Sequence, residues 1–444
     1  MTHLVIVGNG ISGVTVARHV RKRSDMKITI ISAETKHFFS RTALMYAYMG
    51  HMKFENMKPY EDWFWEKNRI ELVFDFVSKV DTDSKKLSLK SGKEISYDKL
   101  VLATGSKYNK FGWPGQDLDG VQGLFSWQDL ELMEKNTANP VNRAVIVGGG
   151  LIGIEMAEML LTRKIPVTFL VRESRYWGGI LPLEEGTLVK RHILEHGIDL
   201  RLNTELGEIL PDENGRVRAV ITKDGTEIPC QFVGLTAGVS PNVKFLEDSK
   251  VETGRGILVN DYLETNVPDV YSLGDCAEIK TPEGERNRLE QLWYTGRMQG
   301  EVLAKTITGE RTIYERGIWF NSAKFLDIEY QTYGQVFGEL REGEAKFYWE
   351  HEDHKHCLKV VFDEKSHVVI GLNVFGIRLR HDVCEKWLKE QRNLEYFLEN
   401  LVEANFDPEF YESFEQSVAD AYNTQFGKTL KAKTKKGFFA SIFG

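Results

Sequence analysis

Cysteine is scarce in this chain of 444 residues, and no two cysteines form a CxxC pair; they are Cys230, Cys276, Cys357 and Cys384. A network of structural disulfides needs regularly spaced cysteines, so the sequence predicts free thiols and a reducing compartment. No apolar run approaches the ~20 residues that a helix needs to span a bilayer. The first apolar strand is expected at residues 4–7, which leaves no room for a signal peptide, and we therefore expect a cytoplasmic protein.

The chain also lacks an excess of positive charge. Its 57 lysines and arginines face 65 acidic residues, giving a net charge of −8, and no broad basic stripe precedes the last twenty residues. Because nucleic-acid binding proteins carry such a stripe, this composition argues against that class. With 42% hydrophobic and 27% charged residues, the chain is typical of a soluble globular protein, and its length suggests about three domains of ~150 residues.

What the sequence does contain is a repeated glycine motif. Residues 5–13 read VIVGNGISG, and residues 145–153, 140 positions later, read VIVGGGLIG. Each copy is expected to run from an apolar strand into a helix. The three glycines of a copy would allow, in order, a tight turn, the approach of a pyrophosphate to the backbone and close packing of the helix on the strand; they are Gly8, Gly10 and Gly13, then Gly148, Gly150 and Gly153. Two copies predict a chain that binds two dinucleotides and passes electrons between them.

The two copies differ after their second strand. In the first, a helix at 14–22 and a strand at 27–32 precede Glu34, which stands 21 residues after Gly13 and suits a ribose hydroxyl pair. In the second, the strand at 167–171 ends in Val171, Arg172 and Glu173. Arg172 could bind a 2′-phosphate, which slightly favours NADPH, whereas the negative charge of Glu173 disfavours a phosphate there. The choice between NADH and NADPH stays open.

The rest of the chain predicts further strands and a separate C-terminal module. A hairpin is expected at 87–89 and 94–97, and a strand at 100–103 ends in Thr104 and Gly105. Further strands are expected at 198–203, 217–222 and 270–273, the last ending at Gly274 and Asp275. From Gly317 onward, alternating strands (347–349, 358–362, 368–375) and helices (383–390, 394–402) predict an α+β module.

With these motifs in place, the chain resembles the FAD-dependent pyridine nucleotide-disulfide oxidoreductase superfamily, closest to the ferredoxin and rubredoxin reductase members that lack a redox disulfide. The resemblance rests on the two glycine motifs, Glu34, residues 103–105, residues 265–275, and Leu292-Trp293 with Gln299-Gly300. It implies an α/β fold with two interleaved Rossmann-like domains and a C-terminal α+β module. The implied division is 1–112 and 245–316 for FAD, 113–244 for NAD(P)H, 317–426 for the module, and 427–444 for a basic and aromatic tail.

The resemblance also implies site residues. The positions implied to bind FAD or NAD(P)H are Gly8, Gly10, Ser12, Gly13, Glu34, Arg41, Val77, Ala103, Thr104, Gly105, Gly148, Gly150, Ile152, Gly153, Arg172, Glu173, Gly238, Gly274, Asp275 and Trp293. Asp275 matches the aspartate that accepts from the ribityl chain of the flavin. Glu155, Trp293 and Tyr46 are the implied catalytic positions beside the reactive flavin edge.

Residues 38–50 depart from the family pattern twice. They keep Arg41 but contain no cysteine, and Tyr46 stands where several relatives have a lysine. Disulfide, coenzyme A-disulfide and cysteine-sulfenate chemistry all need a thiolate, so the first departure argues against them. We therefore expect hydride to pass from NAD(P)H to FAD and electrons to pass to a small iron–sulfur or rubredoxin-like carrier. Two alternatives stay open: a peripheral quinone reductase, and a redox-gated interaction protein resembling apoptosis-inducing factor. Whether the module forms a homodimer is also open.

Two remaining features are not part of the family resemblance. His351, His354, His356 and Cys357 form a dense cluster, which we interpret as a solvent-facing strand rather than a metal site, and we expect no metal. The tail carries five cations followed by an apolar tip: Lys428, Lys431, Lys433, Lys435 and Lys436, then Phe438, Phe439, Ile442 and Phe443. It could attract an anionic surface at the inner face of the membrane or serve as a solvated tail, and the second interpretation is favoured.

Overall fold

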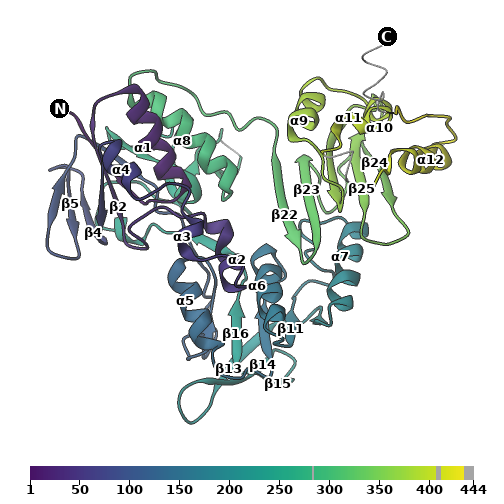
Figure 1. Ribbon diagram of the computed structural model, residues 1–444, viewed down its shortest axis with the longest axis horizontal. Coiled ribbons are helices and arrows are strands. Elements are labelled where there is room, and N and C mark those ends of the chain that lie inside the picture. Colours follow the sequence, from purple (N-terminus) through teal and green to yellow (C-terminus); the bar gives the residue numbers. More distant parts are fainter. Residues whose placement is uncertain (283–284, 407–411, 435–444) are drawn as a thin grey trace. The chain divides into compact units, whose positions relative to one another are not determined.

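The computed structural model describes residues 1–282, 285–406 and 412–434 (Figure 1). The chain forms two compact units. The first consists of Met1–Gly148, Met156–Val167 and Leu206–Arg316, and the second of Gly149–Glu155, Thr168–Glu205 and the described residues from Gly317 onward. The fold is α/β with two Rossmann-like parts, as predicted.

A five-stranded parallel sheet organises the first unit, with the strand order β19-β7-β1-β2-β3. Its strands are Val270–Ser272, Lys99–Leu102, His3–Val7, Lys27–Ser32 and Ile70–Phe74. Strand β1 lies between β7 and β2, so the strand order reverses beside it, where open α/β sheets bind ligands at the carboxyl edge. Helix α1 (Ile11–Arg23) follows β1 directly, and its apolar residues pack with α8 (Trp293–Ile307) in one core, as the neighbouring purple and green helices of Figure 1 show.

Smaller sheets complete the first unit. Their strands, grouped by sheet, are β4 (Val77–Asp81), β5 (Lys86–Leu89) and β6 (Glu94–Ser96); β8 (Ser106–Tyr108) and β17 (Val239–Pro241); β13 (Leu206–Pro211), β14 (Val217–Thr222) and β15 (Glu227–Pro229); β18 (Ile257–Val259), β20 (Ala277–Ile279) and β21 (Arg288–Leu289). The unit also contains three parallel strands of a second five-stranded sheet, β10 (Ala144–Val147), β16 (Phe232–Leu235) and β9 (Val121–Gln122). The short helices of this unit are η1 (Arg41–Ala43), α2 (Leu44–Tyr48), α3 (Phe54–Met57), α4 (Trp63–Lys67), α5 (Trp127–Asn136), η2 (Lys244–Leu246) and η3 (Gly274–Cys276). Helix α6 (Leu151–Thr162) has residues in both units.

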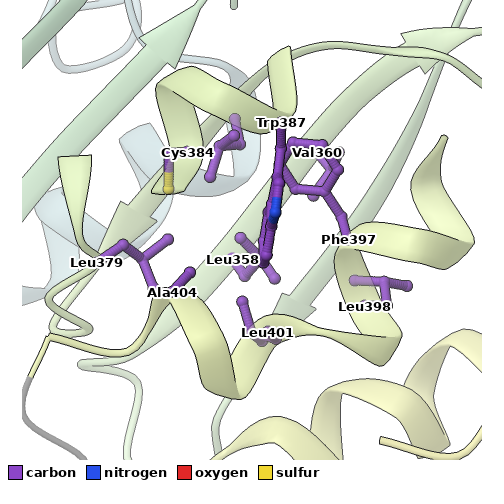
Figure 2. A pocket seen from close by; sticks show the side chains of 10 residues that line it. Leu358, Val360, Leu379, Cys384, Trp387, Phe397, Leu398, Leu401 and Ala404 are labelled. Atoms are coloured by element: carbon purple, nitrogen blue, oxygen red, sulfur yellow. The ribbon is translucent and has the colours of Figure 1, made fainter. Parts of the chain in front are cut away.

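The second unit is built on an antiparallel sheet of order β22-β23-β26-β25-β24. Its strands are Phe320–Phe325, Ile328–Gly334, Val369–Phe375, Cys357–Asp363 and Glu344–Glu350. The other elements are β11 (Val167–Leu170), paired in parallel with β12 (Asp199–Arg201), and the helices α7 (Leu183–Glu195), α9 (His381–Lys389), α10 (Leu394–Glu399), α11 (Leu401–Ala404) and α12 (Glu415–Phe426). Figure 2 shows how Trp387 of α9 and Phe397 of α10 fill the core over Leu358 and Val360 of β25.

The structure confirms most predicted elements and corrects two. The hairpin around Gly92, the strands at 27–32 and 217–222, and the α+β module are present. The single helix predicted at 394–402 is wrong: α10 ends at Glu399 and α11 begins at Leu401, because Asn400 bonds back to the Tyr396 carbonyl and breaks the run. The strand predicted through His354 and His356 is also wrong, since these residues form the turn between β24 and β25, where His354 has φ +58°.

Within the described residues, no helix is both long enough and apolar enough to cross a membrane.

Candidate functional site

The first glycine turn has the shape that a dinucleotide requires. Gly8 has φ +114°, and a Cβ there would lie 2.1 Å from the Ala103 carbonyl oxygen. A Cβ on Gly13 would lie 2.1 Å from the Gly8 carbonyl oxygen, so α1 approaches β1 closely only without a side chain at this position. At Gly10, by contrast, a Cβ would meet nothing within 4 Å. The turn is therefore closed toward the protein and open on the side where the free N–H groups of the α1 N-terminus attract an anion.

Small residues let three segments meet at this turn. A Cβ on Gly274 or on Gly296 of α8 would lie 2.4 Å from the Ser12 Oγ. The Gly274 N–H donates to Gln299 Oε1 at 2.7 Å, and Gln299 Nε2 donates to Glu290 Oε2 at 3.3 Å. The buried Gln299 thereby fixes η3, which carries Asp275, against the glycine turn. This gives the Gln299-Gly300 motif a structural role.

Glu290 anchors that arrangement in the protein interior. Its side chain is 2% exposed, and Tyr314 Oη donates to its Oε2 at 2.7 Å. The Arg288 and Arg316 guanidinium groups stand 3.6 Å and 3.7 Å from its Oε1. Two cations and two hydrogen-bond donors compensate a carboxylate that would otherwise be costly to bury.

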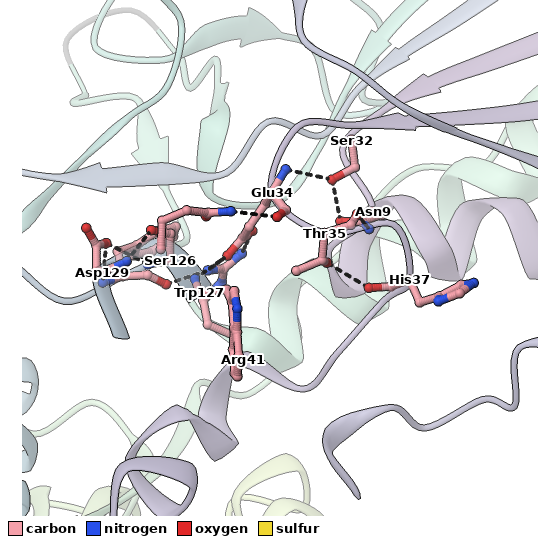
Figure 3. Close-up of polar contacts among 11 residues, drawn as sticks. Asn9, Ser32, Glu34, Thr35, His37, Arg41, Ser126, Trp127 and Asp129 are labelled. Carbon is pink, nitrogen blue, oxygen red and sulfur yellow. Dashed lines mark hydrogen bonds and ion pairs between the residues drawn. The ribbon is translucent and has the colours of Figure 1, made fainter. Parts of the chain in front are cut away.

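The Glu34 carboxylate, the predicted ribose acceptor, is held by two different groups (Figure 3). Arg41 donates Nη1 to Oε1 at 2.8 Å and Nη2 to Oε2 at 2.6 Å. The backbone N–H of Trp127, the first residue of α5, donates to Oε1 at 2.8 Å. Oε2 accepts only the Arg41 bond among the described residues, so it keeps acceptor capacity for a hydroxyl.

Arg41 is itself fixed by its surroundings. It donates to the Phe125 carbonyl, and its guanidinium lies 4.5 Å from the centre of the Phe125 ring. Sequence reasoning missed Phe125 and Trp127, although the capping box of Ser126 and Asp129 could have marked this helix start. Phe125 and Trp127 lie in the loop that supports Arg41 and Glu34.

Asp275 and its neighbours form the next part of the site. The Asp275 side chain is partly exposed within an otherwise buried turn, and burial raises the pKa of its carboxyl, against the charge of Arg41. Gln291 donates to Ser106 Oγ at 2.8 Å beside it. Trp293, the first residue of α8, is half-buried and meets Tyr294 edge-on with 5.5 Å between ring centres.

Two further predicted site residues lie in different surroundings. Tyr46 is half-buried in α2 and stacks on His51 at 6.1 Å. Val77 begins β4 and is 4% exposed, packed in the core of the small sheet that contains β4 and β5. A contact from Val77 to a ligand therefore requires its backbone rather than its side chain.

Thr104 and Gly105 lie just before β8, where the chain leaves the first parallel sheet, and they contact Asn242, just after β17, where it returns. Thr104 Oγ1 donates to the Asn242 carbonyl at 2.8 Å, and the Asn242 N–H donates to the Gly105 carbonyl at 2.9 Å. The adjoining strands β8 and β17 pair antiparallel. Gly238, with φ +87°, precedes β17 and accepts from the Asn109 N–H at 3.1 Å. The chain thus leaves the first parallel sheet and returns to it through one paired connection.

The second glycine turn repeats the geometry of the first. Gly148 has φ +110°, and a Cβ there would lie 2.9 Å from the Ala237 backbone. A Cβ on Gly150 would meet nothing within 4 Å, as at Gly10. Three further predicted residues lie in α6: Ile152 and Glu155 are half-buried and Gly153 is buried. Both turns therefore leave room for a phosphate at the middle glycine.

Arg172 and Glu173, the predicted ribose-site pair, bind each other. Arg172 Nε donates to Glu173 Oε1 at 2.8 Å, and the Arg172 side chain is 76% exposed. The Glu173 carboxylate raises the pKa of Arg172 through this hydrogen bond. The guanidinium that could accept a 2′-phosphate is thus already paired with an anion.

All four cysteine side chains are buried and free. Burial raises the pKa of Cys230 and of Cys384 to about 12, and it also raises the pKa of Cys276 and Cys357. Thiolates are the reactive form of cysteine, so none of the four has the environment of a redox thiol. Cys276, beside Asp275, is a small side chain with no exposed surface.

Comparison with known proteins agrees with this geometry. The chain is 30% identical over 378 residues to nitrite reductase [NAD(P)H] of Bacillus subtilis, covering 84% of this chain and 45% of the relative. It is 27% identical over 410 residues to NADH-rubredoxin oxidoreductase of Clostridium acetobutylicum, covering 90% of this chain and 99% of the relative. The chain spans about half the length of the first curated relatives it matches, 45% and 52%.

A solved structure shows the same fold. The NAD-dependent persulfide reductase from A. fulgidus superposes with a TM-score of 0.82 at 23% identity, covering 96% of this chain and 84% of that one. The family model of the pyridine nucleotide-disulphide oxidoreductases matches residues 2–300, which include both glycine turns and the Asp275 segment. The chain therefore belongs to the pyridine nucleotide-disulphide oxidoreductase family.

Proposed function

We propose that the chain is a flavin-dependent reductase that takes hydride from NADH or NADPH and passes electrons to a small iron–sulfur or rubredoxin-like carrier protein. The observation that carries this proposal is the pairing of two open glycine turns, at Gly10 and Gly150, in one chain that has no accessible thiol. The two turns suit two dinucleotides. The buried cysteines leave no internal disulfide to receive electrons, so an external acceptor is required.

The residues of the first unit fit FAD on three observations. The turn at Gly10 is open where a pyrophosphate would approach. Glu34 keeps acceptor capacity on Oε2 for a ribose hydroxyl. Asp275 is half-buried on a turn that Gln299 fixes through the Gly274 N–H. These three groups would hold the pyrophosphate, the adenosine ribose and the ribityl chain respectively.

When bound, the flavin supplies a centre that accepts a hydride and releases electrons one or two at a time. The work of the chain is orientation, because an aligned donor gains much of its rate from proximity. Gly148, Gly150 and the N-terminus of α6 would bind the pyrophosphate of NAD(P)H. Glu155, Trp293 and Tyr46 are the residues that we propose to act in hydride transfer.

We propose the domain division 1–112 with 245–316, 113–244, and 317–426, in which β8 and β17 form the connection between the first two parts. A homodimer through the C-terminal module would be detected by light scattering as twice the 50.9 kDa chain mass.

Membrane contact by the tail is a separate proposal, which the exposed Lys428 and Lys431 support. Lys433 also donates its Nζ to Asn400 Oδ1 at 2.6 Å, which fixes this part of the tail to the module. Residues 435–444, with Lys435, Lys436 and the apolar tip, lie outside the described residues. If the tail binds membranes, removal of 427–444 abolishes sedimentation with anionic vesicles, and unchanged sedimentation contradicts this proposal.

The proposed activity is tested with the FAD-loaded protein, NADH or NADPH, and two carriers, a rubredoxin and a [2Fe–2S] ferredoxin. Reduction of at least one carrier at a rate far above that of oxygen reduction is expected. A protein that oxidises NAD(P)H but reduces neither carrier contradicts the carrier assignment. Quinone reduction that depends on residues 427–444 would favour the peripheral quinone reductase instead.

A further inference from the structure

Two histidines and an aspartate converge in the second unit, and none of them has a role in the proposed flavin chemistry. His192 and His196 stand one helical turn apart at the C-terminal end of α7. Asp327 lies in the tight turn between β22 and β23, 131 positions beyond His196. One ligand atom from each of the three residues lies within 4.8 Å of the other two.

The hydrogen bonds of His196 fix where its lone pair points. Its Nδ1 lies 2.9 Å from the His192 carbonyl oxygen, and because a carbonyl only accepts, Nδ1 must carry the hydrogen. In the neutral ring, Nε2 then bears the lone pair, and it lies 3.3 Å from Asp327 Oδ1. Two acceptors facing each other repel unless a cation, either a proton or a metal ion, lies between them.

His192 directs the same nitrogen at the same oxygen. Its Nε2 is hydrogen-bonded to Asp327 Oδ1, and its side chain is only 2% exposed. Its Nδ1 is buried without a hydrogen-bond partner among the described residues and lies 3.6 Å from Glu195 Oε2.

The separation of His196 from Asp327 and the groups around the two histidines suit a metal ion. Ligands at ~2.0–2.1 Å from a tetrahedral ion lie about 3.3–3.4 Å from each other, close to the 3.3 Å between His196 Nε2 and Asp327 Oδ1. Metal-binding histidines usually donate their second N–H to a carbonyl or a carboxylate. His196 has the His192 carbonyl in that role, and His192 has Glu195 nearby.

We propose that His192, His196 and Asp327 form a binding site for a divalent transition-metal ion, with Zn²⁺ as the ion that this ligand set fits best. Two imidazoles and one carboxylate form a ligand set that zinc binds, and three protein ligands leave a fourth position for water. The ion would replace the proton between His192 and Asp327 and would tie α7 to the β22–β23 turn. Lys355 Nζ, 3.7 Å from Asp327 Oδ2, partly offsets the attraction for a cation.

A second cluster, His351, Asp353 and His356, is the competing site among the described residues. It lies within one hairpin turn, and Asp353 is already satisfied there. The Lys355 N–H donates to Asp353 Oδ1 at 2.8 Å, and His356 Nδ1 lies 2.7 Å from Oδ2. His351 Nδ1 also lies 3.1 Å from Asp353 Oδ2. None of these three residues is buried, whereas His192 of the α7 cluster is only 2% exposed, so we assign the ion to the α7 cluster.

The test is titration calorimetry of the full-length, FAD-loaded protein with Zn²⁺ after treatment with a chelator. The wild type should bind one ion per chain at this site with micromolar or tighter affinity. His196→Ala and Asp327→Asn remove ligands at exposed positions that should not disturb folding. Each should weaken binding by more than the ~10–100-fold that loss of an outer-shell partner costs. Lys355→Gln should strengthen binding, because it removes the competing charge.

Two control variants distinguish this site from its neighbour. His354→Asn alters an exposed histidine outside both clusters and keeps a residue that tolerates φ +58°, so binding should be unchanged. His356→Ala disables the hairpin cluster and should also leave the tight site intact. Retention of tight binding in His196→Ala and Asp327→Asn, loss of binding in His356→Ala alone, or absence of micromolar binding in the wild type would each overturn the proposal. None of these readouts depends on reductase activity.

Discussion

Arg41 holds the Glu34 carboxylate with two nitrogens at once, Nη1 at 2.8 Å from Oε1 and Nη2 at 2.6 Å from Oε2. A forked guanidinium pair of this kind fixes the orientation as well as the charge of its partner. The α5 N-terminus adds a third donor through the Trp127 N–H. The proposed ribose acceptor is therefore positioned in advance of ligand binding, which lowers the ordering cost of binding.

This pairing predicts a defect in Arg41→Lys. A lysine keeps the charge but cannot form two parallel hydrogen bonds, so Glu34 should lose its fixed orientation. We expect FAD affinity to fall about tenfold, a change of ~1.4 kcal/mol, measured by fluorescence titration of the apoprotein. Arg23→Lys, at the exposed pair with Glu310, is the matched control and should have no effect. If Arg41→Lys and the wild type bind FAD with equal affinity, the fixed orientation of Glu34 does not contribute to FAD binding.

The open glycines predict a pair of variants with separate effects. At Gly10 and Gly150 an added methyl group meets nothing within 4 Å, so alanine should leave the folded protein intact. The methyl group should obstruct the approach of a pyrophosphate. Gly10→Ala should weaken FAD binding, whereas Gly150→Ala should retain FAD and raise the KM for NAD(P)H. If either variant binds its dinucleotide normally, the corresponding turn is structural only.

The Arg172–Glu173 ion pair predicts how nucleotide preference can be changed. Glu173→Ala should free the guanidinium for a 2′-phosphate and increase the NADPH to NADH ratio of kcat/KM by about tenfold. Adding Arg172→Ala should reverse that increase, because the cation responsible is then gone. Steady-state kinetics with both nucleotides provide the measurement. If the NADPH to NADH ratio of kcat/KM does not change in Glu173→Ala, the adenosine ribose of the nucleotide does not bind at Arg172 and Glu173.

Buried Glu185 predicts a stability that falls with rising pH. Burial raises the pKa of Glu185 to about 7 from 4.5, although Lys359 lies 3.9 Å away. Between these values the unfolded carboxyl ionises while the folded one keeps its proton, so stability decreases as pH rises, by at most on the order of 3 kcal/mol. Glu185→Gln should flatten this part of the thermal stability profile and stabilise the protein at pH 8.

Glu184, the neighbouring residue, is the matched control for that prediction. Its hydrogen bonds to Lys346 and Lys359 outweigh its burial and lower its pKa to about 2. Its contribution is present above pH ~4.5 and is lost as pH falls toward 2. Glu184→Gln should therefore destabilise the protein at pH 7, opposite to Glu185→Gln. Identical effects of the two variants would show that the assigned protonation states are wrong.

The buried thiols predict resistance to alkylation. Because Cys276 and the other three cysteines are buried with raised pKa values, iodoacetamide should leave carrier reduction unchanged in the native protein. Mass spectrometry of the treated protein should find unmodified cysteines. Rapid inactivation by one modified cysteine would restore the thiol chemistry that the sequence argues against.

The sequence predicted the parts of the site that are local in the chain. The turn at Gly8–Gly13 and its strand and helix follow from spacing alone, because Gly13 packs against the Gly8 carbonyl within the same βαβ unit. Contacts between distant segments could not be predicted in this way. Trp127 meets Glu34 across 93 positions, and His192 meets Asp327 across 135. Only tertiary packing determines such pairs.

The two wrong elements share a local cause. The run of apolar and charged residues at 394–402 has helical periodicity, but Asn400 competes for the Tyr396 carbonyl and divides the helix. In the histidine cluster, alternation of residue types suggested a strand. Asp353 instead accepts from the Lys355 N–H and closes a turn, which places His354 in the left-handed region.

The central claim is that two dinucleotides meet in this chain, and anaerobic stopped-flow titration tests it most directly. The purified FAD-loaded protein is mixed with NADH or with NADPH, and the flavin absorbance band is followed in time. We predict that at least one nucleotide rapidly bleaches the flavin band of the wild type. The Gly150→Ala variant should lose this rapid bleaching, and the Glu173→Ala variant should retain it with NADPH. A protein that binds no FAD, or whose flavin bleaches only slowly with both nucleotides, would contradict the reductase assignment.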